Sequence, residues 1–293
     1  MADSGFANPK YLVSTDWLAD HLDDPDLRIY DCTTVLIPDP EVTYTIGSGR
    51  DGYAEGHIPG AGYIHCQDDL SDTSARHRFM LADPATYAAN VGRLGIGDGV
   101  RVVLYSRTQL FWSTRAWWTF HAYGFDDVAV LDGGFIKWQA EGRPVSTGPC
   151  TYPPATFTPR PRPEVIASAD QVRGDIGNAD TVILNALARE QHAGTGGNTF
   201  GERVGRIAGS ANAPYAEIAD MEAGTFRSPG EIRKVLEAAG ATADKRILNY
   251  CGGGISATIG YLAEQLLGYD RTVLYDGSMQ EWALDDTLPM ERD

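Results

Sequence analysis

Cysteine is scarce in this 293-residue chain, which contains only four. They are Cys32, Cys66, Cys150 and Cys251, and none belongs to a Cys-x-x-Cys pair or has histidine partners at zinc-ligand spacing. This pattern argues against a disulfide framework and against a zinc site. We expect no metal, and nothing in the sequence indicates a cofactor. Each cysteine is therefore either a core residue or a reactive thiol.

Basic residues are also few, because 24 Lys and Arg stand against 40 Asp and Glu and give a formal net charge of −16. The resulting field repels phosphate backbones and acidic lipid surfaces, which argues against nucleic-acid and membrane binding. Residues 1–10 lack the basic start and apolar run of a secretory signal, and no apolar stretch approaches membrane-spanning length. We expect a soluble protein of the cytoplasm.

What the sequence does contain is an internal repeat. Residues 131–138, Leu-Asp-Gly-Gly-Phe-Ile-Lys-Trp, resemble residues 275–282, Tyr-Asp-Gly-Ser-Met-Gln-Glu-Trp, at an offset of 144. Residues 56–61 likewise resemble residues 205–210 at an offset of 149. A repeat of this length predicts a duplicated domain, because 293 residues suit two domains of roughly 150 residues each.

A proline-rich stretch separates the two copies. Residues 148–163 contain Pro149, Pro153, Pro154, Pro159, Pro161 and Pro163. Proline removes backbone donors and blocks helices, and proline-rich segments are semi-rigid and extended. We therefore predict a first domain over residues 1–147, a linker over residues 148–163 and a second domain over residues 164–293.

Within each copy, short β-rich runs alternate with helical patterns. The runs cover residues 27–30, 101–104 and 128–131 in the first copy, and residues 181–184, 246–250 and 272–275 in the second. Asp83 before Pro84, and Ser228 followed by Pro229 and Glu231, are typical of helix starts. This alternation predicts two α/β domains, each a parallel sheet flanked by helices.

The feature with the clearest chemistry is Cys251 and the loop after it. A strand pattern precedes Cys251 and a helical pattern follows the loop, which consists of Gly252, Gly253, Gly254, Ile255 and Ser256. Ligands bind at the carboxyl ends of parallel strands in open α/β sheets. The glycines allow successive N–H groups to surround the sulfur as an anion nest, which would stabilise a thiolate or a persulfide. The alternative is a core cysteine followed by a tight turn.

The corresponding loop of the first copy differs. An offset of 145 places Ser106 opposite Cys251, in a loop with bulky side chains over residues 106–111. A serine hydroxyl has no means of forming a persulfide. We therefore expect the first domain to be structural and to contribute one wall of the site.

Several segments together resemble those of one known family. Residues 51–64, Asp-Gly-Tyr-Ala-Glu-Gly-His-Ile-Pro-Gly-Ala-Gly-Tyr-Ile, match its first signature, and residues 131–138 and 275–282 match its strand–Asp-Gly–helix segment. The chain thus resembles the tandem-domain rhodaneses, the thiosulfate and 3-mercaptopyruvate sulfurtransferases, over nearly its whole length. The resemblance implies two rhodanese-like domains, of which only the second is catalytic. It also implies that Cys251 carries sulfur as a persulfide.

In this family the residues after the catalytic cysteine indicate the sulfur donor. Thiosulfate-using members carry Arg-Lys there, and mercaptopyruvate-using members carry Gly-Ser or a similar small pair. Gly252 and Gly253 therefore favour 3-mercaptopyruvate, because a charge-assisted contact to the thiosulfate dianion is typically worth about 1.5–3 kcal/mol. The implied acceptors are cyanide, a small thiol or a thioredoxin-like protein.

The second copy departs from the family pattern where the donor's carboxylate is bound. The family carries an Asp at the end of the first strand and an Arg a few residues later, and this chain has Asn185 and Gln191 there. Arg206 replaces the histidine of the second Gly-His-Ile, and Arg203 lies just before it. We predict that Arg203 or Arg206 binds the carboxylate, with Gln191 as a further candidate.

A second departure concerns proton handling. Mercaptopyruvate-type members have a serine two positions after the cysteine, assigned to a set with a first-domain His and Asp, and Gly253 stands at that position. His57 matches the histidine, and Asp51 is a nearby candidate for the acid. The alternative for His57 is a structural hydrogen bond to the backbone. Ser256 either donates to substrate or caps the following helix.

Two other functions fit parts of the sequence. Rhodanese-like folds resemble the catalytic domain of some dual-specificity phosphatases, whose chemistry requires an arginine six positions after the cysteine. That position is Ala257, which nearly excludes a phosphatase. A persulfide carrier for a dedicated partner, with little turnover of small donors, stays open because Asn185, Gln191 and Arg206 alter the usual donor site.

Overall fold

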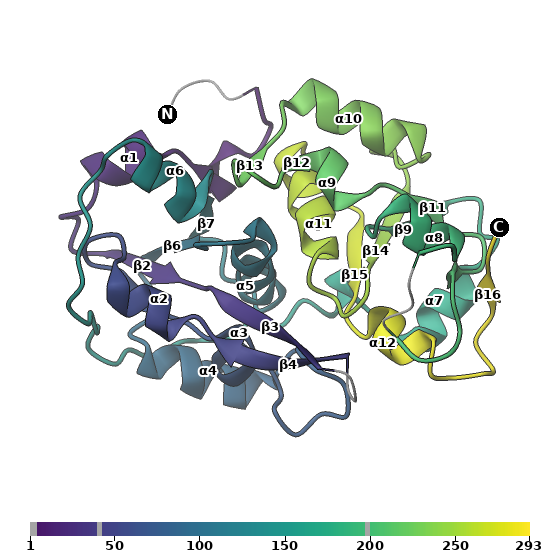
Figure 1. The fold of residues 1–293 in the computed structure, drawn as a ribbon, viewed down its shortest axis with the longest axis horizontal. Coiled ribbons are helices and arrows are strands. Elements are labelled where there is room, and N and C mark those ends of the chain that lie inside the picture. The colour runs from purple at the N-terminus through teal and green to yellow at the C-terminus, as the bar shows by residue number, and fades with distance from the viewer. Residues whose placement is uncertain (1–4, 40–42, 197–199) are drawn as a thin grey trace.

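The computed structural model describes residues 5–39, 43–196 and 200–293. Two five-stranded sheets form the centres of two domains (Figure 1). The first sheet has the order β1-β7-β6-β2-β5, and the second has the order β11-β9-β14-β15-β8. Every strand pair within these two sheets is parallel. The two α/β domains with parallel sheets that the repeat predicts are therefore confirmed.

The predicted strands form the middle of each sheet, and short strands form the edges. The first sheet consists of β1 (Leu12–Val13), β2 (Leu27–Asp31), β5 (Gly62–Tyr63), β6 (Arg101–Tyr105) and β7 (Val128–Leu131). The second consists of β8 (Ile166–Ala167), β9 (Thr181–Asn185), β11 (Ala211–Asn212), β14 (Arg246–Tyr250) and β15 (Thr272–Tyr275). The central strands β6 and β14 are buried after their first residue, as expected for parallel sheets covered on both faces.

Helices cover the faces of both sheets. The first domain contains α1 (Thr15–Asp20), α2 (Arg50–Glu55), α3 (Cys66–Leu70), α4 (Pro84–Arg93), α5 (Leu110–Ala122) and α6 (Gly134–Ala140). The second contains α7 (Ala169–Asp175), α8 (Arg189–Ala193), α9 (Tyr215–Ile218), α10 (Pro229–Ala238), α11 (Ala257–Leu266) and α12 (Ser278–Trp282). Two predicted helix starts are confirmed, because the Asp83 carboxylate caps α4 and Ser228 forms a capping box with Glu231 at α10.

The domains pack together through α5 and α11, which lie side by side at the centre of the molecule (Figure 1). The hydroxyls of Thr114 and Thr258 are 2.8 Å apart across this contact, and the rings of Trp117 and Tyr261 are 6.3 Å apart. Trp117 and Tyr261 belong to a hydrophobic cluster that contains residues of both domains. The inner faces of the two domains therefore share one core.

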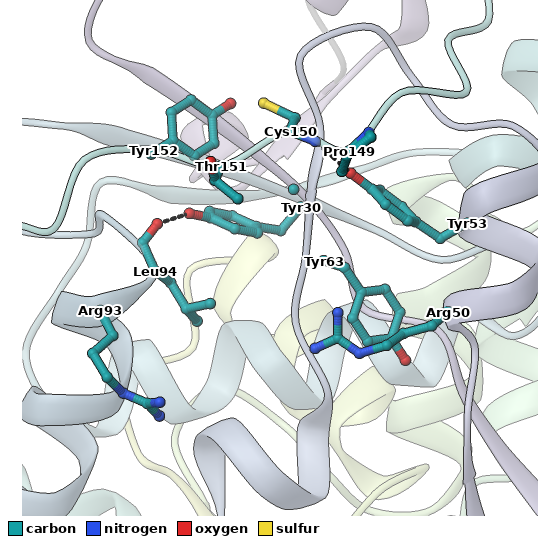
Figure 2. Close-up of a pocket in the computed structure, with 11 residues that line it drawn as sticks. Tyr30, Arg50, Tyr53, Tyr63, Arg93, Leu94, Pro149, Cys150, Thr151 and Tyr152 are labelled. Carbon is teal, nitrogen blue, oxygen red and sulfur yellow. Dashed lines mark hydrogen bonds between the residues drawn. The ribbon is translucent and has the colours of Figure 1, made fainter.

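The linker follows the surface of the first domain. Residues 147–162 contain no helix or strand, and the N–H groups of Ala155, Arg160 and Arg162 donate to carbonyls of the first domain at 2.8–2.9 Å. Where the linker begins, it borders a pocket of about 260 Å³ lined by four tyrosine rings, two arginines and Cys150 (Figure 2). All lining residues belong to the first domain or the linker, and none of them is a predicted site residue.

A long antiparallel hairpin, β3 (Thr34–Asp39) and β4 (Thr43–Ser48), extends from the first domain toward the second (Figure 1). The other short pairs are β10 (Arg206–Ile207) with β16 (Met290–Glu291), and β12 (Ala219–Asp220) with β13 (Thr225–Phe226). The β3–β4 hairpin was not among the predicted elements. Its strand β4 carries Tyr44, which contacts Arg78 and interacts electrostatically with Cys251, as described below.

Candidate active site at Cys251

Cys251 follows β14 directly, at the carboxyl end of the central strand of the second sheet. Its side chain is buried, and its N–H donates to the Ser278 hydroxyl at 3.2 Å. The carbonyl of Cys251 accepts the N–H of Met279 at 3.1 Å, and the carbonyl of Gly252 accepts the N–H of Gln280 at 2.8 Å. The first turn of α12 therefore fixes the backbone of Cys251 and Gly252 through three hydrogen bonds.

Only one of the three loop glycines requires an unusual backbone conformation. Gly254 has φ +72°, and a Cβ at this residue would lie 2.5 Å from the carbonyl oxygen of Asp276. Gly252 and Gly253 lie outside the left-handed region. A Cβ on Gly252 would meet the ring of Phe200, whereas a Cβ on Gly253 would be in ordinary contact with Gln280. Gly252 and Gly254 are therefore needed for space, and Gly254 also for its backbone angles.

The N–H groups from Gly252 to Ser256 donate to no other group within the described residues. Unpaired N–H groups in a glycine-rich turn before a helix are available to an anion, as a nest requires. Ser256 takes the N-cap position of α11, but its side chain makes no capping hydrogen bond. The alternative that Ser256 caps this helix is therefore wrong, because its backbone has helical angles where a capping residue normally has extended ones.

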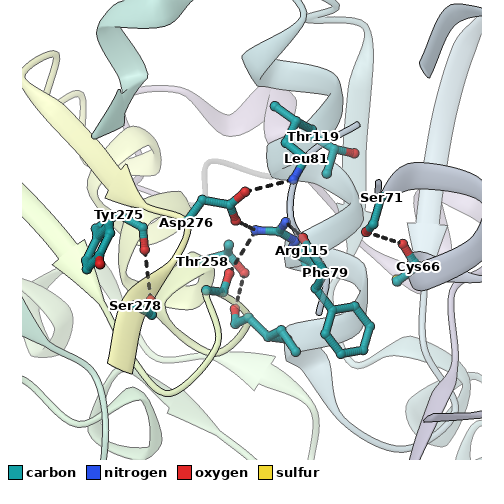
Figure 3. A network of polar contacts seen from close by, with 12 residues as sticks. Cys66, Ser71, Phe79, Leu81, Arg115, Thr119, Thr258, Tyr275, Asp276 and Ser278 are labelled. Atoms are coloured by element: carbon teal, nitrogen blue, oxygen red, sulfur yellow. Dashed lines mark hydrogen bonds and ion pairs between the residues drawn. The ribbon is translucent and has the colours of Figure 1, made fainter. Parts of the chain in front are cut away.

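A buried ion pair from the first domain fastens the far side of the loop (Figure 3). Arg115 of α5 donates to Asp276 at 2.6 Å and to the carbonyl of Gly254 at 3.0 Å, and it also donates to the carbonyl of Phe79. The N–H of Leu81 donates to the second oxygen of Asp276 at 2.8 Å. Two residues of the first domain thus fix the loop and the Asp-Gly segment beside it.

Aromatic side chains from both domains lie near Cys251. Burial raises the pKa of Tyr44 in β4, the neighbouring Arg78 lowers it, and the Cys251 sulfur raises it further. Burial likewise raises the pKa of Tyr215 in α9, again with a contribution from Cys251. Phe111 of α5 packs edge-on against Tyr215 with ring centroids 6.2 Å apart. Phe111 therefore connects α5 of the first domain with α9 of the second, and the contribution of one wall of the site by the first domain stays a prediction.

The sequence analysis missed Tyr44, Arg78, Arg115 and the role of Asp276. The sequence did contain a clue to Asp276, because the repeat pairs it with Asp132. The repeat was interpreted only as evidence of duplication. The other three are in the first domain and precede Cys251 by more than 130 residues. No local pattern connects them with the loop.

The structure gives both predicted clamp arginines partners in the C-terminal segment. Arg203 donates to the carbonyls of Trp282 at 3.4 Å and Leu288 at 2.5 Å. Arg206 pairs with Asp293 at 2.7 Å and donates to the carbonyl of His192. These contacts connect β10 and the residues just before it to the last residues of the chain. Recognition of a donor by Arg203 or Arg206 stays a prediction.

The remaining predicted site residues are not brought to Cys251 by any contact among the described residues. His57 is fully buried in the first domain, where its Nδ1 lies 2.8 Å from the Tyr53 carbonyl and its ring stacks on Tyr53. Its Nε2 has no partner in the described chain. Asp51 is exposed in the first turn of α2. Gln191 is half-buried in α8.

The other thiols have different surroundings. Burial raises the pKa of Cys66 to about 12 and that of Cys32 well above its usual range, so both behave as core residues at neutral pH. Cys150 is half-buried in the linker, and its thiol lies 3.0 Å from the Gly60 carbonyl. Over the described residues, no group of three His, Cys, Asp or Glu side chains is placed to bind a metal. No helix in those ranges is long and apolar enough to cross a membrane.

A family model described as the Rhodanese-like domain matches residues 14–141 and again residues 168–285. The chain belongs to the rhodanese family of sulfurtransferases. Each match covers four of the five strands of one parallel sheet, leaving out only the edge strand β1 or β8, and Cys251 lies in the second match. The stretch between the matches, residues 142–167, contains the predicted linker of this rhodanese.

Curated relatives cover nearly all of this rhodanese. It is 30% identical over 282 residues to the 3-mercaptopyruvate sulfurtransferase of Escherichia coli, which covers 96% of this chain and 98% of the relative. It is 34% identical to the sulfur carrier protein TtuD of Thermus thermophilus, over 95% of each chain. It is 32% identical to the thiosulfate sulfurtransferase of Bos taurus, over 92% of this chain and 91% of the relative.

Solved structures share the arrangement of the two domains. The crystal structure of SseA from Escherichia coli, a 3-mercaptopyruvate sulfotransferase, matches with a TM-score of 0.81 and 28% identity. The match covers 92% of this chain and 98% of SseA. The crystal structure of Tum1 from Saccharomyces cerevisiae matches with a TM-score of 0.81, and at 21% identity it shows the fold alone.

Proposed function

We propose that this sulfurtransferase accepts sulfur on Cys251, prefers 3-mercaptopyruvate to thiosulfate, and passes the sulfur to a thiol or to cyanide. The observation that carries the proposal is the Cys251 loop, in which a cysteine at the end of the central strand precedes N–H groups that have no partner in the described chain. Such groups favour an anionic sulfur, either thiolate or persulfide. The 3-mercaptopyruvate sulfurtransferase relative adds support.

The reaction proceeds by nucleophilic covalent catalysis in two displacements. The Cys251 thiolate attacks the sulfur of 3-mercaptopyruvate, an S–S bond forms, and the donor's C–S bond breaks. The electron pair of that bond and the donor's thiol proton pass to the methylene carbon, which gives pyruvate and an anionic persulfide. Attack by a thiolate or cyanide on the outer sulfur then breaks the S–S bond, gives a new persulfide or thiocyanate, and restores the Cys251 thiolate.

The donor preference rests on the charge of the loop. Thiosulfate carries two negative charges in a compact group, and the chain's net charge of −16 repels it, so nearby cations must supply the attraction. Gly252 and Gly253 supply only N–H groups. 3-Mercaptopyruvate carries one carboxylate, remote from its sulfur, which a cation outside the loop can bind. The relatives themselves include both donor types, so the preference rests on these residues and not on overall identity.

A second candidate function is that of a persulfide carrier for a dedicated partner protein. The observation that favours it is the 34% identity to the sulfur carrier protein TtuD, over 95% of each chain. In that case Cys251 would still bear the sulfur, but turnover with small donors would be slow. A thioredoxin-like protein or another protein thiol would then be the acceptor, and the cytoplasm stays the predicted location.

The test combines steady-state kinetics with mass spectrometry. The purified protein is assayed with 3-mercaptopyruvate and with thiosulfate, and the Cys251 peptide is examined for one added sulfur. We expect higher kcat/KM with 3-mercaptopyruvate, and an added sulfur that cyanide removes. Cys150→Ser serves as a matched control because Cys150 is also a free thiol. Higher kcat/KM with thiosulfate would contradict the donor preference, and stable persulfide with negligible turnover would favour the carrier.

A further inference from the structure

Arg78 is a half-buried cation of the first domain whose charge is not balanced by a carboxylate in the described residues. Its guanidinium carbon lies 4.5 Å from the centre of the Tyr44 ring, and the guanidinium donates to the Tyr44 carbonyl. Of the ion pairs found in the described chain, none includes Arg78. In a chain with 40 acidic and 24 basic residues, such a cation is available to an anionic ligand.

The backbone of Arg78 is attached to the Cys251 loop through one side chain. The amide of Gln280 donates to the Arg78 carbonyl at 2.9 Å, and the N–H of Gln280 donates to the Gly252 carbonyl at 2.8 Å. The same Gln280 side chain lies 3.5 Å from where a Cβ on Gly253 would be. Arg78, Gln280 and the two loop glycines therefore form one contiguous group across the domain boundary.

Tyr44 positions the side chain of Arg78. Its ring centre lies 4.5 Å from the guanidinium carbon, and its backbone carbonyl accepts a hydrogen bond from the guanidinium. A guanidinium held over an aromatic ring has fewer orientations available, and its planar fork of donors suits bidentate binding of a carboxylate. The hairpin that carries Tyr44 thus holds the guanidinium of Arg78, and the backbone carbonyl of Arg78 accepts the amide of Gln280 next to the loop.

The other arginines around the loop already have partners. Arg115 is buried against Asp276 and holds the Gly254 carbonyl. Arg206 pairs with Asp293, and Arg203 donates to carbonyls of the C-terminal segment. Binding a donor through any of these would require existing contacts to break. Binding through Arg78 requires no ion pair of the described chain to break.

We propose that Arg78 binds the carboxylate of the sulfur donor, with Tyr44 orienting its guanidinium, and so supplies the cation that Gly252, Gly253 and Gln191 do not. The inference deepens the proposed function and rests on it, because it assumes a donor that carries a carboxylate. It also makes the first domain a contributor to donor specificity and not only a structural partner.

The first test compares Arg78→Met with Arg50→Met. Arg50 is a matched control because it also belongs to the first domain, stacks on a tyrosine at 4.5 Å and makes no ion pair in the described chain, yet it lines the separate pocket of Figure 2. We expect Arg78→Met to raise the KM for 3-mercaptopyruvate by about 10- to 100-fold while kcat changes little. Arg78→Lys should recover part of this loss, and Arg50→Met should have an unchanged KM.

A structural role alone would give a different result. If Arg78→Met lowers the melting temperature but leaves KM within about twofold of the wild type, the inference is overturned. Arg206→Ala extends the comparison, because breaking its pair with Asp293 should lower the melting temperature without raising KM. A large rise in KM in Arg206→Ala and none in Arg78→Met would show that Arg206, and not Arg78, binds the carboxylate of the donor.

A binding measurement separates this inference from the proposed function. Pyruvate, a carboxylate without sulfur, is used to protect Cys251 from alkylation by the neutral reagent iodoacetamide, and the Cys251 peptide is quantified by mass spectrometry. We expect protection in the wild type and Arg50→Met, and at least a ~10-fold higher pyruvate concentration for the same protection in Arg78→Met. This result would support Arg78 even without turnover of 3-mercaptopyruvate. Absent or equal protection in all three proteins would overturn it.

Discussion

The two domains have the same backbone plan around the loop that follows their central strand. β6 ends before Ser106 and β14 ends before Cys251. The Ser106 carbonyl accepts the N–H of Phe135 at 3.0 Å, and the Cys251 carbonyl accepts the N–H of Met279 at 3.1 Å. The fold therefore presents equivalent positions in both copies. The domains differ in the side chain at this position, a hydroxyl or a thiol, which shows that chemistry depends on the site and not on the fold.

The two loops also differ in backbone conformation at a position where both angles are known. The offset of 145 pairs Gln109 with Gly254. Gln109 has an extended backbone with φ −121°, whereas Gly254 has φ +72°. The left-handed residue turns the second loop beneath Asp276, where the Gly254 carbonyl meets Arg115. The glycines of the second copy thus allow a backbone path that the first copy does not adopt.

The contacts between the two domains also differ between the copies, at the aspartate of each Asp-Gly segment. Asp276 accepts the N–H of Leu81, and its counterpart Asp132 accepts the N–H of Phe226, so each domain holds the Asp-Gly segment of the other. Only Asp276 also pairs with an arginine, because the position in the second copy that corresponds to Arg115 is Gly260. Burial raises the pKa of Asp132 to about 6. The ion pair therefore reinforces the side of the interface that borders Cys251.

A third pair lies at the ends of equivalent strands. Asp31 is opposite Tyr105, and Asn185 is opposite Tyr250. In both copies one side-chain oxygen accepts a nearby N–H, from Thr33 or Leu187, and the other polar atom has no partner in the described residues. Burial raises the pKa of Asp31 to about 6, although the Thr33 hydroxyl and N–H lower it. The second copy has a neutral amide where the first has a carboxyl.

Moving the thiol between the domains is the strongest test of this comparison. Cys251→Ser should lower sulfur transfer by at least ~1,000-fold, because the hydroxyl cannot carry the persulfide. Adding Ser106→Cys to that variant should not restore transfer, since the first loop lacks the glycines and the left-handed turn. Rates are measured by thiocyanate formation. Recovery of transfer in the double variant would show that a thiol on either scaffold is sufficient.

Breaking the buried ion pair should have the largest effect on stability. Arg115→Met leaves Asp276 buried without its cation, which typically costs about 3–5 kcal/mol in the free energy of unfolding. Asp132→Asn, at the corresponding place without an arginine, should cost less than about 1 kcal/mol. Urea unfolding followed by tryptophan fluorescence provides both values. Equal losses would mean that the interface is symmetric in energy despite its contacts.

Alanine substitutions separate the roles of the loop glycines. Gly254→Ala should cost about 2 kcal/mol or more, because its φ is positive and its Cβ would lie 2.5 Å from the Asp276 carbonyl oxygen. Gly253→Ala should cost less than about 1 kcal/mol, since its Cβ has only ordinary contacts. Thermal unfolding and transfer assays of the two variants give the comparison. A tolerated Gly254→Ala would contradict the described turn.

Replacing Asp31 of the first copy by asparagine, the residue that the second copy has at Asn185, should have the smallest effect on the free energy of unfolding. Because Asp31 binds its proton more strongly when folded than when unfolded, its contribution to stability falls as pH rises from about 4 to about 6. Asp31→Asn removes this dependence. The difference in free energy of unfolding between variant and wild type should therefore be about 1–3 kcal/mol more favourable to the variant at pH 7 than at pH 4.

The matching measurement is a series of urea unfolding curves between pH 4 and pH 8. Thr33, which hydrogen-bonds to Asp31, and Arg107 and His57, which lower its pKa through their charge, all remain in the variant. Asp132, with its pKa raised to about 6, should leave part of the pH dependence in place. A steeper pH dependence in Asp31→Asn than in the wild type would contradict the burial of this carboxyl.

The sequence alone was sufficient for the features that depend on neighbouring residues. The strands, the helix starts at Asp83 and Ser228, and the glycine loop after Cys251 follow from local patterns, and the duplication follows from comparing the two halves. The hairpin β3–β4 was missed because no tight two-residue turn signal separates its strands. The cap at Ser256 was wrong because the backbone there is already helical.

Only the tertiary structure decided which residues of the first domain lie beside Cys251. Tyr44, Arg78 and Arg115 approach the loop because α5 packs against α11 and the hairpin extends across the boundary. The partners of Arg203 and Arg206 became visible in the same way, since the C-terminal segment returns to β10. These contacts join residues far apart in the chain, and their geometry depends on how two complete domains pack, which local residue patterns do not encode.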